Sequence, residues 1–206
     1  MSQLIAIHPK DPQARLIRRV VDILEQGGVV VYPTDSSYAL GCHIGDKHAL
    51  ERIRRIRRIE RDHDFTLVCS DLSEIANYAR VGNSAYRLLK SLTPGPYTFI
   101  LPATREVPKR LQDPKRRSIG IRVPNDRIAQ ALTEALGQPL MSSTLQLPGE
   151  DIPLTDVDEI QDKVGPLVDL IIDAGPGGIE PTTVLDFTSG EVEVVRLGRG
   201  DASAFM

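Results

Sequence analysis

The chain has 206 residues, of which 41% are hydrophobic and 26% are charged, the balance of a folded globular protein and not of a disordered or fibrous one. Its formal net charge of −3 argues against a general nucleic-acid binder, although residues 51–61 and 109–117 each gather basic side chains. Two cysteines give no disulfide framework, and no apolar run approaches the roughly 20 residues that span a bilayer. We therefore expect one domain over residues 1–206, without a signal peptide and in the cytoplasm.

The first half of the chain alternates helix and strand patterns. Residues 11–27 predict a helix that Asp11 caps and Gly27 ends. The glycine-bounded, β-branched run that follows predicts a buried strand over residues 27–32. A polar stretch at 33–37 and a short segment up to Cys42 come next. Further along, the patterns predict helices over residues 49–57, 71–79 and 83–92, and a strand over residues 65–69.

The second half is richer in strands. Two helices are predicted, over residues 126–136 and 155–164. Strands are predicted over residues 97–103, 118–124, 139–146, 168–175, 182–187 and 192–198. Continuous apolar strands between helices indicate an α/β fold with a mixed sheet, covered on both faces and largely parallel at its centre. The last strands lack intervening helices and should pair antiparallel.

Polar side chains follow several of the predicted strands. Thr34 and its neighbours follow the first strand, residues 142–146 end another, and Arg122 and Arg196 end two more. Ligands of open α/β sheets collect beyond the carboxyl ends of strands, so we expect one cavity lined by hydroxyls, an amide and guanidinium groups. Such a cavity would bind an anionic, oxygen-rich ligand. Any one hydroxyl taken alone is better explained by a local turn or cap.

Other catalytic chemistries find little support. There is no phosphate-loop pattern, and the glycines of residues 173–178 lack dinucleotide-loop spacing. The four histidines show no metal-ligand spacing with acids or cysteines, so no tightly bound metal is expected. Cys42 is interpreted as a core thiol.

Five motifs in order resemble the YrdC/YciO family, and in detail its YciO branch. They are YPTDSSYALGC (32–42), TPGPYTFIL (93–101), IGIRVPN (119–125), PTTVLDF (181–187) and VVRLG (194–198), with the serine-rich strand end at 142–146 between the third and fourth. The likeness spans nearly the whole chain. It implies a YrdC-like twisted, open, mixed sheet with helices on its faces and a cationic concave surface.

The resemblance also implies an activity. Family members are threonylcarbamoyl-AMP synthases, nucleotidyltransferases that use ATP with Mg²⁺, L-threonine and bicarbonate to form threonylcarbamoyl-AMP and pyrophosphate, which serves the modification of tRNA adenosine 37. Members are also described as binding double-stranded RNA or tRNA. Two alternatives stay open: a nucleotide- or RNA-binding paralogue without turnover, and a variant that hydrolyses ATP or threonylcarbamoyl-AMP. The chain would act as a monomer or a homodimer.

The resemblance assigns roles to residues of this sequence. Threonine or its carbamate would be held by Thr34, His63 and Thr182. The nucleotide would be held by Arg55, Arg58, Arg122, Ser143 and Arg196, and the catalytic set would be Arg57, Thr144 and Gln146. RNA would contact Arg54, Arg55 and Arg58, although a charged helix face is as often simply solvated.

Two family motifs are altered here. The synthases carry Lys-x-Arg before the second strand, where this chain has Arg57-Arg58-Ile59 or, with a gap, Arg55-Ile56-Arg57. Their Ser-x-Asn becomes Thr144-Leu145-Gln146, which moves the amide onto a longer arm. A shift near 1 Å lowers the rate strongly when catalysis consists of positioning. The altered motifs therefore predict that ligand binding survives and leave full synthase activity open.

Overall fold

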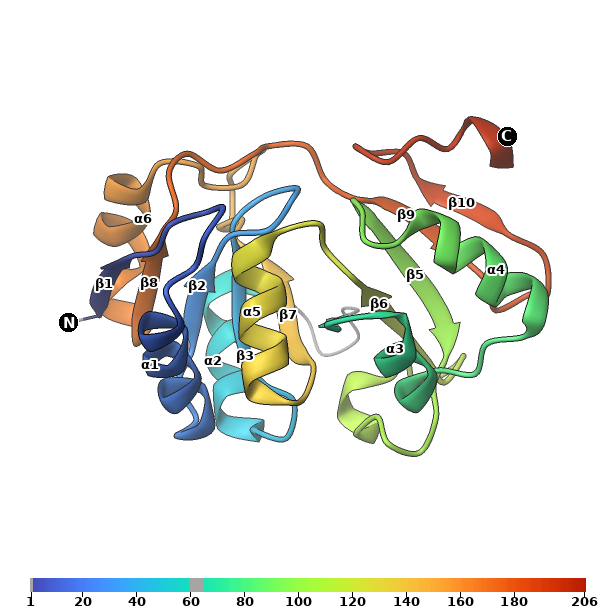
Figure 1. Ribbon diagram of the computed structural model, residues 1–206, viewed down its shortest axis with the longest axis horizontal. Coiled ribbons are helices and arrows are strands. Elements are labelled where there is room, and N and C mark those ends of the chain that lie inside the picture. Colours follow the sequence, from blue (N-terminus) through green and yellow to red (C-terminus); the bar gives the residue numbers. More distant parts are fainter. Residues whose placement is uncertain (1, 60–64) are drawn as a thin grey trace.

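The fold is built on one strongly twisted mixed sheet with helices on both faces (Figure 1). It is seen in a computed structural model that describes residues 2–59 and 65–206, so His63 lies outside the described residues. The strands are β1 (Gln3–Ala6), β2 (Val30–Tyr32), β3 (Ala39–His43), β4 (Thr66–Val68), β5 (Tyr97–Pro102), β6 (Ser118–Arg122), β7 (Leu140–Thr144), β8 (Leu170–Asp173), β9 (Thr183–Asp186) and β10 (Glu193–Arg196). All eight strands predicted from the sequence are present; β1 was not predicted, and β3 forms the short segment before Cys42.

The helices agree with the predicted ones to within a few residues. They are α1 (Ala14–Glu25), α2 (Lys47–Arg57), α3 (Leu72–Tyr78), α4 (Asn83–Leu92), α5 (Arg127–Leu136) and α6 (Val157–Val164). The predicted cap at Asp11 is wrong, because α1 starts after Gln13 and has no side-chain cap. Asp126 does cap α5, accepting from the Ala129 amide at 2.8 Å, and Gly137 ends that helix with φ 68°. None of the helices in the described ranges is long and apolar enough to cross a bilayer.

The strand order is β1-β8-β2-β3-β7-β4-β6-β5-β9-β10. Parallel pairs are β1–β8, β2–β8, β4–β6 and β5–β9, whereas β2–β3, β3–β7, β4–β7, β5–β6 and β9–β10 are antiparallel. The expectation of a largely parallel centre is therefore wrong. The polar stretch after β2 is a tight turn that makes β2 and β3 a hairpin, and β7 inserts antiparallel between β3 and β4. The antiparallel pairing expected near the C-terminus is confirmed.

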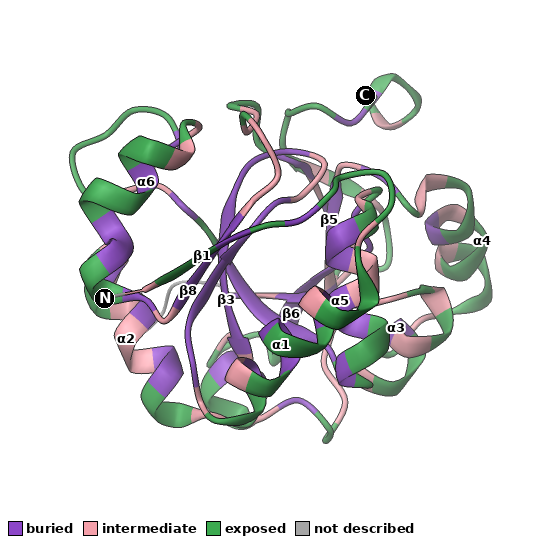
Figure 2. Ribbon diagram, turned by 60° about the vertical axis from the view of Figure 1, so that its left-hand side comes forward, coloured by how far each residue is buried: buried purple, intermediate pink, exposed green. Residues whose placement is uncertain are grey.

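Two apolar clusters cover opposite faces of this sheet, because side chains alternate along each strand. One face packs against α1 and α5, which lie side by side, through Val20 and Leu132. The other face packs against α2, α3, α4 and α6, with Ile53 and Ile160 among the buried contacts. Figure 2 shows the purple buried stripe of each helix turned toward the purple strands.

Helices α1 and α5 cover only part of their face of the sheet. Its apolar cluster involves β1, β2, β7 and β8, together with Val68 of β4. Further along the sheet, the same face of β5, β6 and β9 carries Thr98, Gly120 and Val184, which line a hollow instead. The architecture therefore leaves one part of the sheet open for a ligand.

Candidate functional site

The hollow on the open face of the sheet has a volume of about 630 Å³. Its floor is made by small or hydroxylated residues of five strands: Ala39, Thr66, Thr98, Gly120 and Ser142. A Cβ atom at Gly120 would lie 3.2 Å from Thr66 Oγ1, so the floor has little room for a larger residue. Short side chains in an otherwise apolar sheet thus create the space.

Arg57, the last residue of α2, reaches across to the end of β7. Its Nη1 donates to Ser143 Oγ at 2.6 Å, and its Nε donates to the carbonyl oxygen of Gln146 at 3.1 Å. Burial lowers the pKa of this guanidinium from its usual value. The two contacts fix the charged group at one side of the hollow.

Arg122, at the end of β6, lies nine-tenths buried in the wall of the hollow. Its Nη2 donates to Asp35 Oδ1, and its Nη1 donates to Ser36 Oγ at 3.2 Å. The other Asp35 oxygen accepts from the Asn125 amide at 2.8 Å. Arg122 Nε is buried and has no hydrogen-bond partner among the described residues. The turn after β2 therefore holds Arg122 in place while one of its donors stays unused.

Arg196, at the end of β10, lines the hollow next to Thr182. Its Nη2 donates to the Thr182 carbonyl at 2.9 Å and to Thr182 Oγ1 at 3.0 Å, and Thr182 Oγ1 is 2.7 Å from Thr98 Oγ1. Burial, and then the positive charge of Arg122, lower the pKa of Arg196. Among the residues described, neither Arg57 nor Arg196 forms an ion pair. The hollow thus holds guanidinium charge that a bound anion could neutralise.

The expected convergence of residues is found, but on the face of the sheet and not beyond one edge. The predicted residues that the hollow brings together are Arg57, Arg122, Ser143, Thr144, Gln146, Thr182 and Arg196. Strands β6 and β7 run antiparallel, so their carboxyl ends point to opposite edges. Arg122 of β6 and Thr144 of β7 line the hollow from the same face of the sheet, whereas Ser143 alternates to the other face, where Arg57 of α2 contacts it. Ser37 and Ser142 belong to the polar strand ends that were expected to line a cavity, whereas the lining residues Thr66 and Thr98 were not predicted.

Thr34 lies outside this hollow. Its Oγ1 accepts from the amides of Ser36 and Ser37, each at 3.2 Å, and donates to the Ser37 carbonyl at 2.7 Å. These hydrogen bonds stabilise a local turn, the alternative explanation given above for any single hydroxyl at a strand end. Thr34 lines a neighbouring cavity, whereas Thr182 lines the hollow, so the expectation that they share one pocket is not met. Ser37 lines both cavities.

The arginine run of α2 divides into several environments. Arg52 pairs with Asp169 at 2.6 Å. Arg54 pairs with Glu51 at 2.6 Å and lies over the Phe65 ring, with only 10% of its side chain exposed, so it is poorly placed to contact RNA. Arg55 and Arg58 are exposed and do not line the hollow. Only the last helical residue, Arg57, turns into the site.

Two further side-chain types bear on the chemistry. Within residues 2–59 and 65–206, no three His, Cys, Asp or Glu side chains are grouped to hold a metal ion. Cys42 is fully buried, and burial raises the pKa of its thiol to about 12, which confirms it as a core thiol. The hollow therefore offers cations and hydroxyls to a ligand and no thiolate nucleophile.

Comparison with known proteins identifies the family. The family model of Sua5, YciO and YrdC proteins, described as "Telomere recombination", matches residues 22–198. The chain belongs to this family. It is 55% identical to a protein of Haemophilus influenzae over 207 residues and to YciO of Escherichia coli (strain K12) over 206, in both cases along the full length of both chains. The resemblance read from the motifs is thereby confirmed.

Solved structures agree with this placement. The crystal structure of E. coli YciO is similar with a TM-score of 0.96, 55% identity and full coverage of both chains. P. abyssi Sua5, in a crystal structure complexed with L-threonine, is similar with a TM-score of 0.85 and 23% identity over 96% of this chain and 58% of the Sua5 chain. The second likeness shows a shared fold. The YrdC-like twisted sheet expected from the sequence is therefore present.

Proposed function

We propose that the hollow binds ATP and that the chain joins L-threonine and bicarbonate to the nucleotide, forming threonylcarbamoyl-AMP and pyrophosphate. One observation carries this proposal. Three guanidinium groups, from Arg57, Arg122 and Arg196, line a single hollow together with hydroxyls from several strands. Guanidinium groups match phosphate and carboxylate oxygens, and two of the three have no ion-pair partner in the described ranges.

The reaction needs no protein nucleophile. L-Threonine and bicarbonate condense with loss of water, and an oxygen of the resulting N-carboxy group attacks the α-phosphorus of ATP. The bond from that phosphorus to the β-phosphate oxygen breaks, and pyrophosphate leaves. Arg57 and Arg196 would neutralise the negative charge that spreads over the phosphates. Mg²⁺ would arrive on the triphosphate, since the described side chains offer it no cluster of carboxylates.

The choice of L-threonine draws on relatives. The P. abyssi Sua5 structure contains L-threonine, and its fold matches this one. In this chain Thr182 and Ser143 would contact the amino acid or its carbamate on the side of the hollow between Arg57 and Arg196. The product would serve tRNA modification, and release of a reactive adenylate to a partner fits an open hollow.

A single incubation tests the proposal. The protein is mixed with ATP, Mg²⁺ and bicarbonate, with or without L-threonine, and pyrophosphate and AMP are measured. We expect pyrophosphate that depends on threonine, and its loss in Arg196→Gln but not in Arg105→Gln, an exposed arginine elsewhere. AMP release that ignores threonine would mean hydrolysis instead, and the absence of any turnover would overturn the proposal.

A second candidate is nucleotide binding without synthesis. It is favoured by the contacts of Arg57, which already donates to Ser143 and to the Gln146 carbonyl. A guanidinium held in this way binds a phosphate but adjusts poorly to a moving transition state. Calorimetry with AMP and ATP separates this candidate from the first, because it predicts micromolar to millimolar binding with no pyrophosphate formed.

A further inference from the structure

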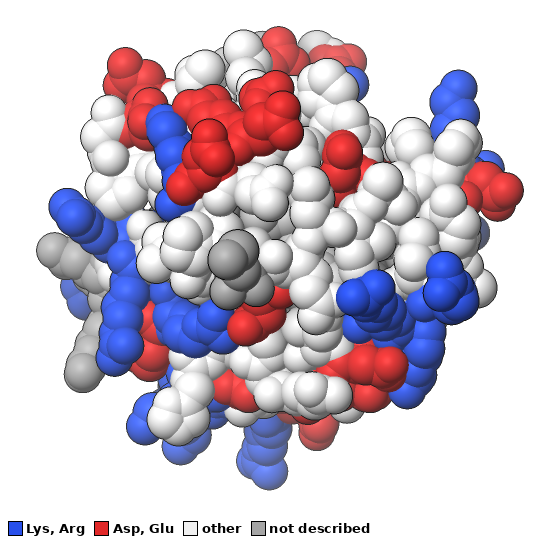
Figure 3. Space-filling model, turned by 90° about the vertical axis from the view of Figure 1, so that its left-hand side faces the viewer, with Lys and Arg blue, Asp and Glu red and all other residues white. Residues whose placement is uncertain are grey.

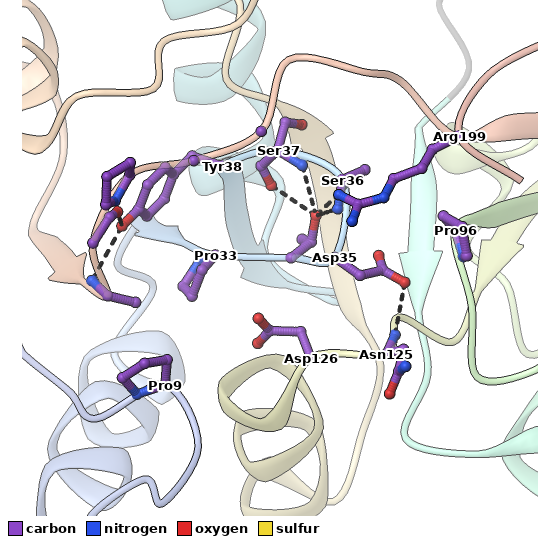
Figure 4. Close-up of a pocket in the computed structure, with 16 residues that line it drawn as sticks. Pro9, Pro33, Asp35, Ser36, Ser37, Tyr38, Pro96, Asn125, Asp126 and Arg199 are labelled. Atoms are coloured by element: carbon purple, nitrogen blue, oxygen red, sulfur yellow. Dashed lines mark hydrogen bonds between the residues drawn. The ribbon is translucent and has the colours of Figure 1, made fainter.

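A second cavity lies on the other side of the turn that follows β2 (Figure 4). Its volume is about 380 Å³, within the range of small-ligand pockets. The turn forms one wall, residues 174–178 a second, and the start of α5 a third. Apolar surface comes from Tyr38 and from the proline rings at positions 9, 33, 96 and 176. Of the residues that line it, only Thr34 was given a role by the family resemblance.

The cavity wall is built by specific contacts. Tyr38 Oη donates to the Gly175 carbonyl at 2.6 Å and accepts from the Ala174 amide at 3.1 Å. A Cβ atom at Gly177 would lie 2.6 Å from the Tyr38 ring, and one at Gly178 would collide with the Ser36 carbonyl. The glycines of the 174–178 segment are therefore needed for it to close against the turn.

Asp126 supplies an uncompensated carboxylate at the floor of this cavity. It is partly buried, and its Oδ1 caps α5 through the Ala129 amide. It forms no ion pair with any described side chain, whereas its neighbour Asp35 is neutralised by Arg122. Burial, opposed by the amides of the helix start, raises the pKa of Asp126 to about 6, with a smaller raising effect from Asp35. At neutral pH a negative charge therefore faces the cavity; Arg122 lowers the pKa of Asp126 slightly but is itself paired with Asp35.

Arg199 supplies the opposite charge. Its backbone is fixed by a 2.9 Å bond from its amide to the Pro181 carbonyl, and its guanidinium has no ion pair among the described residues. Figure 4 shows Arg199 extending over the turn beside Ser36, while Asp126 lies below the turn near Pro33. The cavity thus presents a carboxylate and a guanidinium from two different directions.

We propose that this cavity is a second binding site, for a small zwitterion whose ammonium group contacts Asp126 and whose anionic group contacts Arg199. The short aliphatic part between the two charges packs against Pro9, Pro33 and the Tyr38 ring. Each protein charge gains an ion-pair partner that it lacks in the described structure, and the gain is larger at the partly buried Asp126 than at the exposed Arg199. A ligand with only one charge would leave the other protein group unpaired.

Calorimetry at pH 7.5 with three zwitterions of increasing length, β-alanine, γ-aminobutyrate and 5-aminovalerate, tests this site. n-Butylamine and butyrate serve as singly charged probes. We expect at least one zwitterion to bind tenfold or more tightly than either singly charged probe. The site is independent of the proposed reaction, so this result stands whether or not pyrophosphate is formed.

Variants locate the binding. Asp126→Asn and Arg199→Gln should each weaken the best zwitterion tenfold or more. Asp156→Asn makes the same change at the cap of α6, and Arg105→Gln removes an exposed arginine elsewhere; neither should alter binding. Failure of all three zwitterions to bind below about 10 mM, or equal binding by wild type and Asp126→Asn, would overturn the proposal.

Discussion

Arg57 and Ser143 are joined by a 2.6 Å hydrogen bond that links the last turn of α2 to the end of β7. The two residues are 86 positions apart in sequence; Arg57 lies in the altered Lys-x-Arg segment and Ser143 in the serine-rich strand end at 142–146. Their contact means that the two segments form a single side of the hollow. A substitution in either segment that breaks this hydrogen bond therefore also alters the position of the other segment.

Removing the Arg57 charge should weaken nucleotide binding. We expect Arg57→Gln to lower the affinity for ATP about tenfold, since one charge-assisted contact to phosphate is lost. Titration calorimetry of wild type and variant measures the effect. Arg105→Gln, exposed and without an ion pair in the described ranges, is the matched control. Equal ATP affinity in wild type and Arg57→Gln would remove Arg57 from the site.

The Asp35–Arg122 ion pair should matter for stability. Both side chains are about 10% exposed, so Asp35→Asn leaves a buried guanidinium without its counterion. We expect a loss of about 3 kcal/mol in the free energy of unfolding, measured with urea. Glu150→Gln, which breaks the exposed pair with Lys163, should cost less than about 1 kcal/mol. A loss below that bound for Asp35→Asn would show that the turn is held by other contacts.

Asp126 should make stability depend on pH in a defined direction. Its pKa in the folded state is raised to about 6, so the folded state binds a proton more readily than the unfolded chain does. Its favourable contribution is complete below the unfolded pKa, about 3.9, and is lost as pH rises through about 6. Asp126→Asn does not titrate and can still cap α5. Relative to wild type, it should gain about 2 kcal/mol between pH 4 and pH 7.

Urea unfolding of both proteins across that pH range measures this gain, with no added ligand. Asp156→Asn, the same exchange at the cap of α6, is the control for altered capping. A difference between wild type and Asp126→Asn that stays constant from pH 4 to pH 7 would contradict the raised pKa.

RNA binding by α2 remains a prediction, and it now concerns only Arg55 and Arg58, which are exposed. Figure 3 shows a cluster of acidic side chains in the upper part of one face, whereas the lower half carries most of the basic side chains with acidic ones among them. Residues 150–162, which include most of α6, carry six carboxylates, so RNA is expected to bind away from α6. Arg55→Gln/Arg58→Gln should reduce the salt dependence of tRNA binding by one to two units of slope, about one per lost phosphate contact. Arg15→Gln/Arg87→Gln, two exposed arginines elsewhere, should not; an equal slope in both double variants would exclude α2.

Much of the fold could be predicted from the sequence, because apolar periodicity and capping residues act locally. Strand β1 was missed because QLIA is short and its outer face, including Leu4, is exposed. The prediction of a largely parallel centre was wrong because the direction of neighbouring strands depends on the strand order, and β7 lies antiparallel between β3 and β4. No local pattern indicates that β7 lies between β3 and β4.

The candidate site was predicted in part. Arg122, Thr182 and Arg196 were expected to line one ligand site, and they do line one hollow. The hydroxyl of Thr34 instead forms hydrogen bonds within its own turn. Thr66 and Thr98 were not predicted, although small polar residues on apolar strands are the pattern expected for the floor of a ligand site. The cavity beside Asp126 could not, since it needs residues 174–178 to close over a turn far away in sequence.

The position of β8 has a consequence for how the chain is made. Strand β1 pairs with β8, whose first residue is Leu170, and in the described sheet it has no other neighbour. During translation β1 therefore lacks its pairing partner until the segment that begins at Leu170 has been synthesised. Contacts of such sequence separation slow folding. The growing polypeptide therefore exposes an unsatisfied edge at residues 3–6 for most of its synthesis, when chaperones are most needed.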